Sequence, residues 1–150
     1  MPIKLPKLIL SMGICLLAGG VGTIFTSYAI PIWYVTLNKP GFSPPNWVFG
    51  PVWTTLYILM GISLYMVWTK RKVANIFWIQ LFLNFLWSII FFGWHNPLLA
   101  LADIVALWVA IVLTIRSFYK INKLASYLLY PYLVWVSFAT VLNLMIVLLN

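Results

Sequence analysis

Long apolar runs, interrupted by prolines and basic clusters, constrain the fold of this chain more than any other feature. They predict helices over residues 8–30, 45–68, 74–93, 97–119 and 124–149. Each run has roughly the 20 residues that a helix needs to cross a bilayer. The alternating polarity of barrel strands is absent. We therefore expect an all-α integral membrane protein, a five-transmembrane-helix bundle in which residues 1–150 form one transmembrane domain.

The charged residues are few and lie beside the apolar runs. Only 7% of the residues are charged, against roughly 25% in soluble proteins. A formal net charge of +8 might suggest nucleic acid as a partner, but no polar domain carries it, so we expect none. If the spans alternate, one side of the membrane carries only Lys39. The other side carries Lys4, Lys7, Lys70, Arg71, Lys72, Arg116, Lys120 and Lys123.

This asymmetry predicts the orientation, because basic residues favour the cytoplasmic side. The N-terminus is expected in the cytoplasm, with the loop between the first two spans and the C-terminus outside. The short N-terminus and the lack of a basic tail favour a prokaryotic cytoplasmic membrane.

Residues 33–53, WYVTLNKPGFSPPNWVFGPVW, combine aromatic residues with prolines between two spans. Pro40, Pro44 and Pro45 each remove an amide donor, so a lipid-exposed helix cannot run through this segment. Long irregular connections are often lids or binding loops. We expect residues 33–44 to form a lid on the non-cytoplasmic face, above a binding pocket.

Catalytic and metal-binding residue types are scarce. Cys15 is the only cysteine, His95 the only histidine and Asp103 the only acid, so we expect neither a metal site nor a bound cofactor. An acidic group inside a span needs a partner. Asp103 either makes a structural hydrogen bond or contacts a ligand, and the sequence leaves both open.

Polar and aromatic residues share faces of the third and fifth spans. Helical spacing aligns Gln80, Asn84, Trp87, Ser88 and Phe91 on one face, and Tyr132, Trp135, Ala139 and Asn143 on another, just after a predicted bend at Pro131. Trp53, Trp87 and Trp135 lie within spans beside small or amide residues. Their flat indoles would suit a flat, rigid, mostly apolar ligand, although ordinary packing explains them equally.

Small residues recur at helical spacing in the first and fourth spans. Ala18 pairs with Gly22, and Ala102, Ala106 and Ala110 form a stripe. Such stripes let helices approach closely. They indicate either packing within one bundle or a homodimer face.

Several blocks resemble the translocator protein family, also called the tryptophan-rich sensory protein or peripheral-type benzodiazepine receptor family. The blocks are WYVTLNKPGFSPPNWVFGPVWTTLYILMG (33–61), QLFLNFLWSIIFF (80–92), LALADIVAL around Asp103 and ASYLLYPYLVWVSFATVLN (125–143). The resemblance implies a five-helix bundle, commonly dimeric, acting as a membrane receptor or sensor. Its expected ligands are porphyrins and haem-like tetrapyrroles, isoquinoline carboxamides, benzodiazepines and sterols.

The same resemblance implies a pocket beneath the first loop, lined by Tyr34, Pro44, Trp53, Tyr57, Asn84, Ser88, Phe91, Ile104, Trp135 and Ala139; Trp87 and Asp103 join this set from the reasoning above. In some bacterial members the tryptophans matching Trp53 and Trp135 are implicated in light-dependent porphyrin breakdown, which makes this pair the catalytic candidates. Transport with Asp103 coupling protons is a further alternative.

Two departures from vertebrate members change the expectations. The Tyr and Arg of the sterol pattern are missing from residues 142–150, which argues against tight sterol binding. Leu99 stands where vertebrate members have a Trp early in the fourth span, so the pocket wall is expected to differ there.

Overall fold

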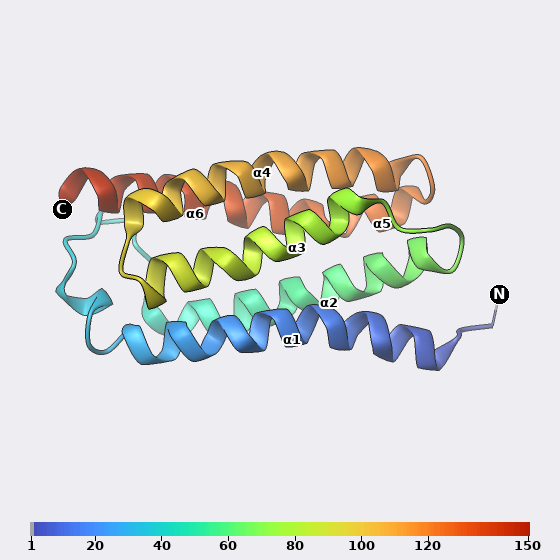
Figure 1. Cartoon of the computed structure of the whole chain (residues 1–150), viewed down its shortest axis with the longest axis horizontal. Coiled ribbons are helices and arrows are strands. Elements are labelled where there is room, and N and C mark those ends of the chain that lie inside the picture. The colour runs from blue at the N-terminus through green and yellow to red at the C-terminus, as the bar shows by residue number, and fades with distance from the viewer. Residues whose placement is uncertain (1) are drawn as a thin grey trace.

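The structure, a computed structural model, describes residues 2–150 and contains five helical spans long and apolar enough to cross a membrane (Figure 1). No strand occurs among the described residues. The helices are α1 (Leu5–Ala29), α2 (Phe49–Trp68), α3 (Asn75–Ser88), α4 (Pro97–Tyr119), α5 (Lys123–Tyr127) and α6 (Tyr130–Leu149), joined by the short turns η1 (Tyr34–Thr36), η2 (Asn46–Val48) and η3 (Ile89–Gly93). The all-α five-span architecture expected from the sequence is confirmed.

Prolines and asparagines set the starts of the helices. A proline occupies the first turn of α1, α4 and α6, where its missing amide costs no helical hydrogen bond. The side chain of Asn96 accepts a hydrogen bond from the Leu99 amide at 3.0 Å, and Asn122 accepts one from Ala125 at 3.2 Å. These caps explain why the fourth and fifth spans begin directly after short polar turns.

The last span is divided into α5 and α6. Pro131 has no amide to donate to the Tyr127 carbonyl, and the helix is interrupted at residues 128–129, immediately before α6. The third span also changes geometry near its end, since η3 is a π-helical turn that continues α3. Such turns are often found at functional sites.

The helices form a closed bundle (Figure 1). Helix α1 packs against α2 and α3, α3 packs against α4, and α4 packs against α6, while α5 and α6 return to α2. Helices α1 and α2 are in close contact at Gly61, where an added Cβ would lie 2.7 Å from the Cα atom of Met12. Gly61 therefore lets two backbones touch near the N-terminal end of the bundle.

The small residues noted in the sequence divide between the interior and the surface. Gly22 is buried and faces the Ser88 side chain, and Ala110 is also buried. Ala102 and Ala106 are exposed on the outer face of α4. Packing within the bundle thus accounts for only part of the two stripes.

The segment between α1 and α2 covers one end of the bundle, beside the C-terminus (Figure 1). The Asn38 amide donates to the Asn150 side chain at 3.0 Å, and Asn150 donates back to the Asn38 carbonyl at 2.9 Å. Lys39 donates to the Tyr34 carbonyl at 2.9 Å and lies over the Tyr34 ring. The segment is therefore fastened to α6 as well as to its own backbone.

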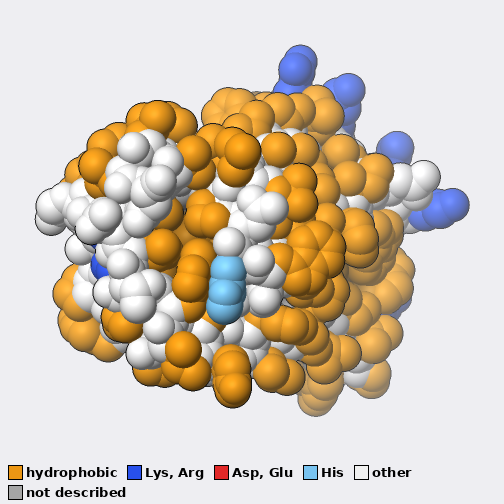
Figure 2. All heavy atoms as spheres, turned by 60° about the vertical axis from the view of Figure 1, so that its left-hand side comes forward, with side chains coloured by type: hydrophobic (Ala, Val, Ile, Leu, Met, Phe, Trp, Pro, Cys, Tyr) orange, Lys and Arg blue, Asp and Glu red, His pale blue; other side chains and the backbone are white. Residues whose placement is uncertain are grey.

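The surface is dominated by hydrophobic side chains, as expected where lipid surrounds a protein. Figure 2 turns the loop end toward the viewer, and most Lys and Arg side chains project at the far end. The end with the N-terminus is thus basic, and the orientation of the two ends in the membrane stays a prediction.

Candidate functional site

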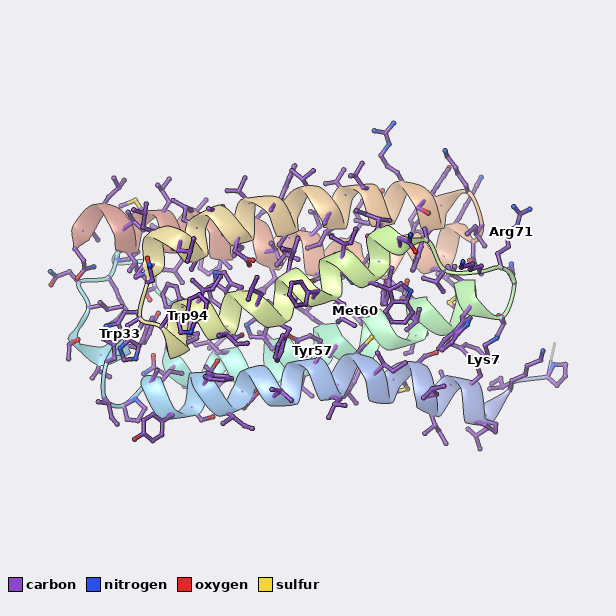
Figure 3. All side chains as sticks on the ribbon, in the orientation of Figure 1. Lys7, Trp33, Tyr57, Met60, Arg71 and Trp94 are labelled. Atoms are coloured by element: carbon purple, nitrogen blue, oxygen red, sulfur yellow. The ribbon has the colours of Figure 1, made fainter. Side chains whose placement is uncertain are left out.

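A cavity of about 500 Å³ lies beneath the loop. Its wall comes from α1, α2, the α3–η3 junction, α6 and the segment before α2. The lining comprises Leu16, Gly19, Gly20, Gly22, Thr23, Thr26, Ser27, Ile30, Tyr34, Asn46, Trp47, Phe49, Gly50, Trp53, Thr54, Tyr57, Trp87, Ser88, Phe91, Phe92, Trp135, Phe138, Ala139, Leu142, Asn143 and Ile146. In Figure 3, Trp33 and Trp94 mark the loop end, and Tyr57 lies nearer the middle of the bundle.

Pairs of aromatic rings form one part of the wall. The rings of Trp53 and Trp135 meet edge to face, with centroids 6.4 Å apart and an interplanar angle of 89°. Trp53 stacks on Tyr57 one helical turn later, at 5.7 Å. Trp87 stacks on Phe91 in the same way, at 5.0 Å. These geometries are favourable for aromatic rings and hold each indole in place.

A chain of buried hydrogen bonds forms the floor. Tyr57 donates to the Asn84 carboxamide oxygen, and the Asn84 amide donates to the Tyr132 hydroxyl at 2.7 Å. The Tyr132 hydroxyl then donates to Gln80 at 2.9 Å. Three helices are joined through these side chains, so the amide face of the third span is directed inward and its polar groups are satisfied.

Two buried donors of the cavity wall have no protein partner among residues 2–150. They are the Trp135 indole nitrogen and the Tyr34 hydroxyl. Tyr34 is 2% exposed and lies outside the spans; burial raises its pKa above the ordinary value of 10.0, and the nearby Ser43 hydroxyl opposes part of that rise. Both groups keep their protons at neutral pH, but neighbouring side chains cover both donor atoms, so a ligand would reach them only after those side chains shift.

The cavity opens sideways between α1 and α2. Exposed residues on the outer faces of these two helices also line it, namely Gly20, Thr23, Ser27, Gly50 and Thr54. The hydroxyls of Thr23 and Thr54 each donate to a carbonyl of their own helix, at 2.9 and 2.8 Å. The opening thus presents methyl groups and bare backbone toward the lipid.

Most of the predicted site residues meet at this cavity. Tyr34, Trp53, Tyr57, Trp87, Ser88, Phe91, Trp135 and Ala139 line it, whereas Pro44, Asn84, Asp103 and Ile104 do not. Pro44 lies half-buried in the loop, and Asn84 lies in the floor behind Tyr57. The resemblance placed these residues from sequence blocks, which do not specify the depth of each side chain.

Helix α4 contributes no residue to the lining, because α3 and α6 separate it from the cavity. Ile104 is 1% exposed and belongs to the main apolar core. Asp103 is 8% exposed and makes no side-chain hydrogen bond among residues 2–150, so neither the structural hydrogen bond nor the cavity contact considered from the sequence is seen; one of its carboxylate oxygens is buried without a partner. Leu99 also lies outside the wall, so it contributes nothing to the cavity.

The sequence reasoning missed the wall provided by α1 and the later part of α6. Gly19, Gly22 and Thr26 come from the span that the resemblance covered least. The sequence feature that could have identified them is their small size, which recurs at helical spacing opposite the aromatic residues. Asn143 was placed on the correct face, and it accepts a hydrogen bond from the Trp87 indole at 3.1 Å.

The described lining residues include no His, Cys, Asp or Glu side chain that could bind a metal ion. Among the described residues, no group of three His, Cys, Asp or Glu side chains lies close enough to hold an ion. The arrangement instead suits a flat apolar molecule held between aromatic rings, with few polar contacts.

Comparison with known proteins places these features in a family. The sequence model of the TspO/MBR family matches residues 11–149. The chain is 50% identical to "Tryptophan-rich protein TspO" of Archaeoglobus fulgidus, over 96% of this chain and 97% of that protein. It is 49% identical to the Chlorobaculum tepidum protein of the same name, over 95% of each. It is 43% identical to the human "Translocator protein", over 74% of this chain and 70% of that protein. The chain therefore belongs to the TspO/MBR family and is an integral membrane protein.

Proposed function

We propose that this protein is a membrane receptor or sensor that binds a porphyrin or haem-type tetrapyrrole in the cavity beneath the loop. The observation that carries the proposal is the aromatic cavity itself, a space of about 500 Å³ walled by the rings of Trp53, Trp87 and Trp135. A tetrapyrrole offers flat faces on which these indoles can stack. Isoquinoline carboxamides and benzodiazepines, also flat and mostly apolar, would occupy the same space, and sterols with lower affinity.

Size and rigidity support this class of ligand. A cavity of about 500 Å³ falls within the roughly 300 to 1,000 Å³ of small-molecule sites. Trp87 is fixed by Asn143, and the floor is fixed by Asn84, so the walls need little reordering on binding. A preorganised wall lowers the entropic cost of binding.

Titration of protoporphyrin IX into the purified protein tests the proposal. We expect quenching of tryptophan fluorescence, with affinity reduced in Trp135→Phe, which removes the donor and keeps a ring, and in Trp53→Phe. Trp78→Phe is the matched control, because Trp78 packs with Trp68 and Phe77 away from the cavity. If all three variants bound protoporphyrin IX with the same affinity as the parent protein, the cavity would not be the binding site.

A second candidate function is light-dependent porphyrin breakdown, favoured by the contact between Trp53 and Trp135. An indole stacked on a porphyrin bound in this cavity would be an oxidisable electron donor to the excited porphyrin. The test compares product spectra under light for the parent protein and the Trp53→Phe/Trp135→Phe double variant, at protein concentrations that give equal porphyrin occupancy. Equal rates would assign the bleaching to the porphyrin alone. The position of Asp103 gives no support to proton-coupled transport, because its carboxylate does not line the cavity.

We also propose a homodimer, with the N-terminus in the cytoplasm and the loop outside. The exposed Ala102 and Ala106 on α4 would allow a second copy to approach closely. Disulfide trapping of an Ala106→Cys variant in membranes tests the dimer. The control is Val134→Cys, because Val134 is an exposed residue on α6. Trapping that is equal at both positions would count against an α4 interface.

A further inference from the structure

The end of the bundle opposite the loop carries a second hollow, of about 520 Å³. It lies where α4 ends and the chain turns into α5 and α6. Its lining consists of Ile115, Arg116, Tyr119, Lys120, Tyr127 and Tyr130. Neither the proposed receptor function nor the family resemblance uses these residues.

The cations of this hollow have no counter-ion in the chain. The only acidic side chain is Asp103, which precedes Arg116 by 13 positions, or about 20 Å along the helix. That separation exceeds the Debye length of about 10 Å. Nearby hydrogen bonds within residues 2–150 use Asn122 and Ser126, and none uses the side chain of Arg116 or Lys120. Two positive groups are thus left without an anion.

The positions of the charges distinguish this hollow from the rest of the basic end. Arg116 and Lys120 are four residues apart on one helical face, where like charges repel. Lys7, by contrast, donates to the Trp68 carbonyl at 3.1 Å and lies over its ring. The preference of basic residues for the cytoplasmic side accounts for positive charge at this end of the bundle. It does not account for two cations that line the same hollow.

Tyrosines complete the hollow beside the cations. Tyr127 stacks on Tyr130 with ring centroids 6.0 Å apart, and Tyr119 lies 6.3 Å from Tyr127. The Lys123 ammonium lies 5.4 Å from the Tyr119 ring and adds a third positive charge at the rim. Phenol hydroxyls and a guanidinium fork are donors that suit phosphate oxygens.

One turn deeper in the membrane, the surface beside the hollow becomes apolar. Leu113 on α4 and Val134 on α6 are both exposed, Val134 at 68%. A molecule with an anionic head and hydrocarbon tails would thus find donors at the headgroup level and apolar side chains beneath them. Free phosphate would use only the first of these surfaces.

We propose that this hollow binds the phosphate headgroup of an anionic phospholipid from the adjacent leaflet. Arg116 and Lys120 bind the phosphate, the tyrosine hydroxyls donate to its remaining oxygens, and the acyl chains lie over Leu113 and Val134. Basic pockets between transmembrane helices bind anionic lipids by this chemistry.

Native mass spectrometry of the purified full-length protein tests the proposal. The probes are palmitoyl-oleoyl phosphatidylglycerol and the phosphatidylcholine with the same chains. We expect the parent protein to retain one phosphatidylglycerol preferentially, and Arg116→Gln/Lys120→Gln to bind it about tenfold or more weakly. Arg71→Gln/Lys72→Gln is the matched control, since it removes the same charge at exposed positions that do not line the hollow, and Arg71 lies at the same end of the bundle (Figure 3). This control is expected to stay within twofold of the parent.

Several results would overturn the proposal. Equal losses in the two double variants would indicate a diffuse electrostatic attraction, and equal retention of the two lipids would indicate no headgroup recognition. Displacement of phosphatidylglycerol by millimolar inorganic phosphate would indicate a free-anion site. If the Arg116→Gln/Lys120→Gln variant does not fold, Lys120→Gln alone is compared with Lys72→Gln by the same measurement.

Discussion

The contact between Gly19 and Tyr57 allows a sharp test of the cavity floor. A Cβ added at Gly19 would lie well inside the van der Waals contact distance of the Tyr57 ring. The ring has little freedom to move, because its hydroxyl is bonded to Asn84 and its face stacks on Trp53. Gly19→Ala therefore has to displace either the ring or the whole of α1.

The expected cost follows from two terms. Overpacking of a filled interior costs about 1 to 3 kcal/mol. Loss of the bond between Tyr57 and Asn84 adds roughly 0.6 kcal/mol, the average for side-chain hydrogen bonds in membrane proteins. Gly13→Ala is the matched control on the same helix, since a Cβ there meets nothing within 4 Å. The gain in helix propensity, about 1 kcal/mol, is common to both variants. Gly19→Ala should therefore be about 2 to 4 kcal/mol less stable than Gly13→Ala.

Unfolding in mixed micelles with increasing dodecyl sulfate, followed by tryptophan fluorescence, measures this difference. Porphyrin titration should show weaker binding in Gly19→Ala and unchanged binding in Gly13→Ala. A Tyr57→Leu background provides the decisive cycle, because removing the ring should abolish most of the cost of Gly19→Ala. Equal stability of the two alanine variants, or a cost that persists without the ring, would refute the proposed contact.

Three further predictions concern single polar groups. Asn84→Leu should destabilise the protein by about 1 to 3 kcal/mol, because it leaves the buried Tyr57 hydroxyl without a partner and the Tyr132 hydroxyl with only its bond to Gln80; chemical unfolding measures this, and a neutral result would contradict the hydrogen-bonded floor. Asn38→Ala should speed amide exchange and proteolysis of the loop while leaving global stability within about 1 kcal/mol, because it removes only an exposed link to the C-terminus. Burial raises the pKa of Tyr34, so its contribution to stability is complete below pH 10.0 and is lost above it; the parent protein should lose more stability in alkali than Tyr34→Phe, and parallel pH profiles would contradict this.

The sequence predicted the spans well because each span is defined by local chemistry. Apolar length, prolines and basic clusters are properties of neighbouring residues, and the caps at Asn96 and Asn122 follow the same local rules. The start of the first span was predicted at residue 8, and α1 begins at Leu5. The apolar count begins only after Lys7, but a proline is compatible with the first helical turn.

The site was predicted less completely because its lining depends on which helices are neighbours. The sequence pattern around Asp103 and Ile104 predicts an inward-facing side of the helix, but it does not say what that side faces. In the structure it faces the apolar core, and α3 and α6 lie between α4 and the cavity. The glycines of α1 carry no chemical signal of their own. Their role becomes visible only when Tyr57 and Ser88 are placed opposite them.

The cavity exists because large and small side chains are divided unequally between the helices around it. Helices α2, α3 and α6 supply indoles and phenols, and each of these rings is held by a ring or an amide of a neighbouring turn or helix. Apart from Leu16, helix α1 supplies only glycine, serine and threonine, which cannot reach across the space. The aromatic rings therefore cannot collapse into the cavity without breaking their own contacts. Substitutions that enlarge side chains of α1 should close the cavity, whereas truncating a ring should enlarge it.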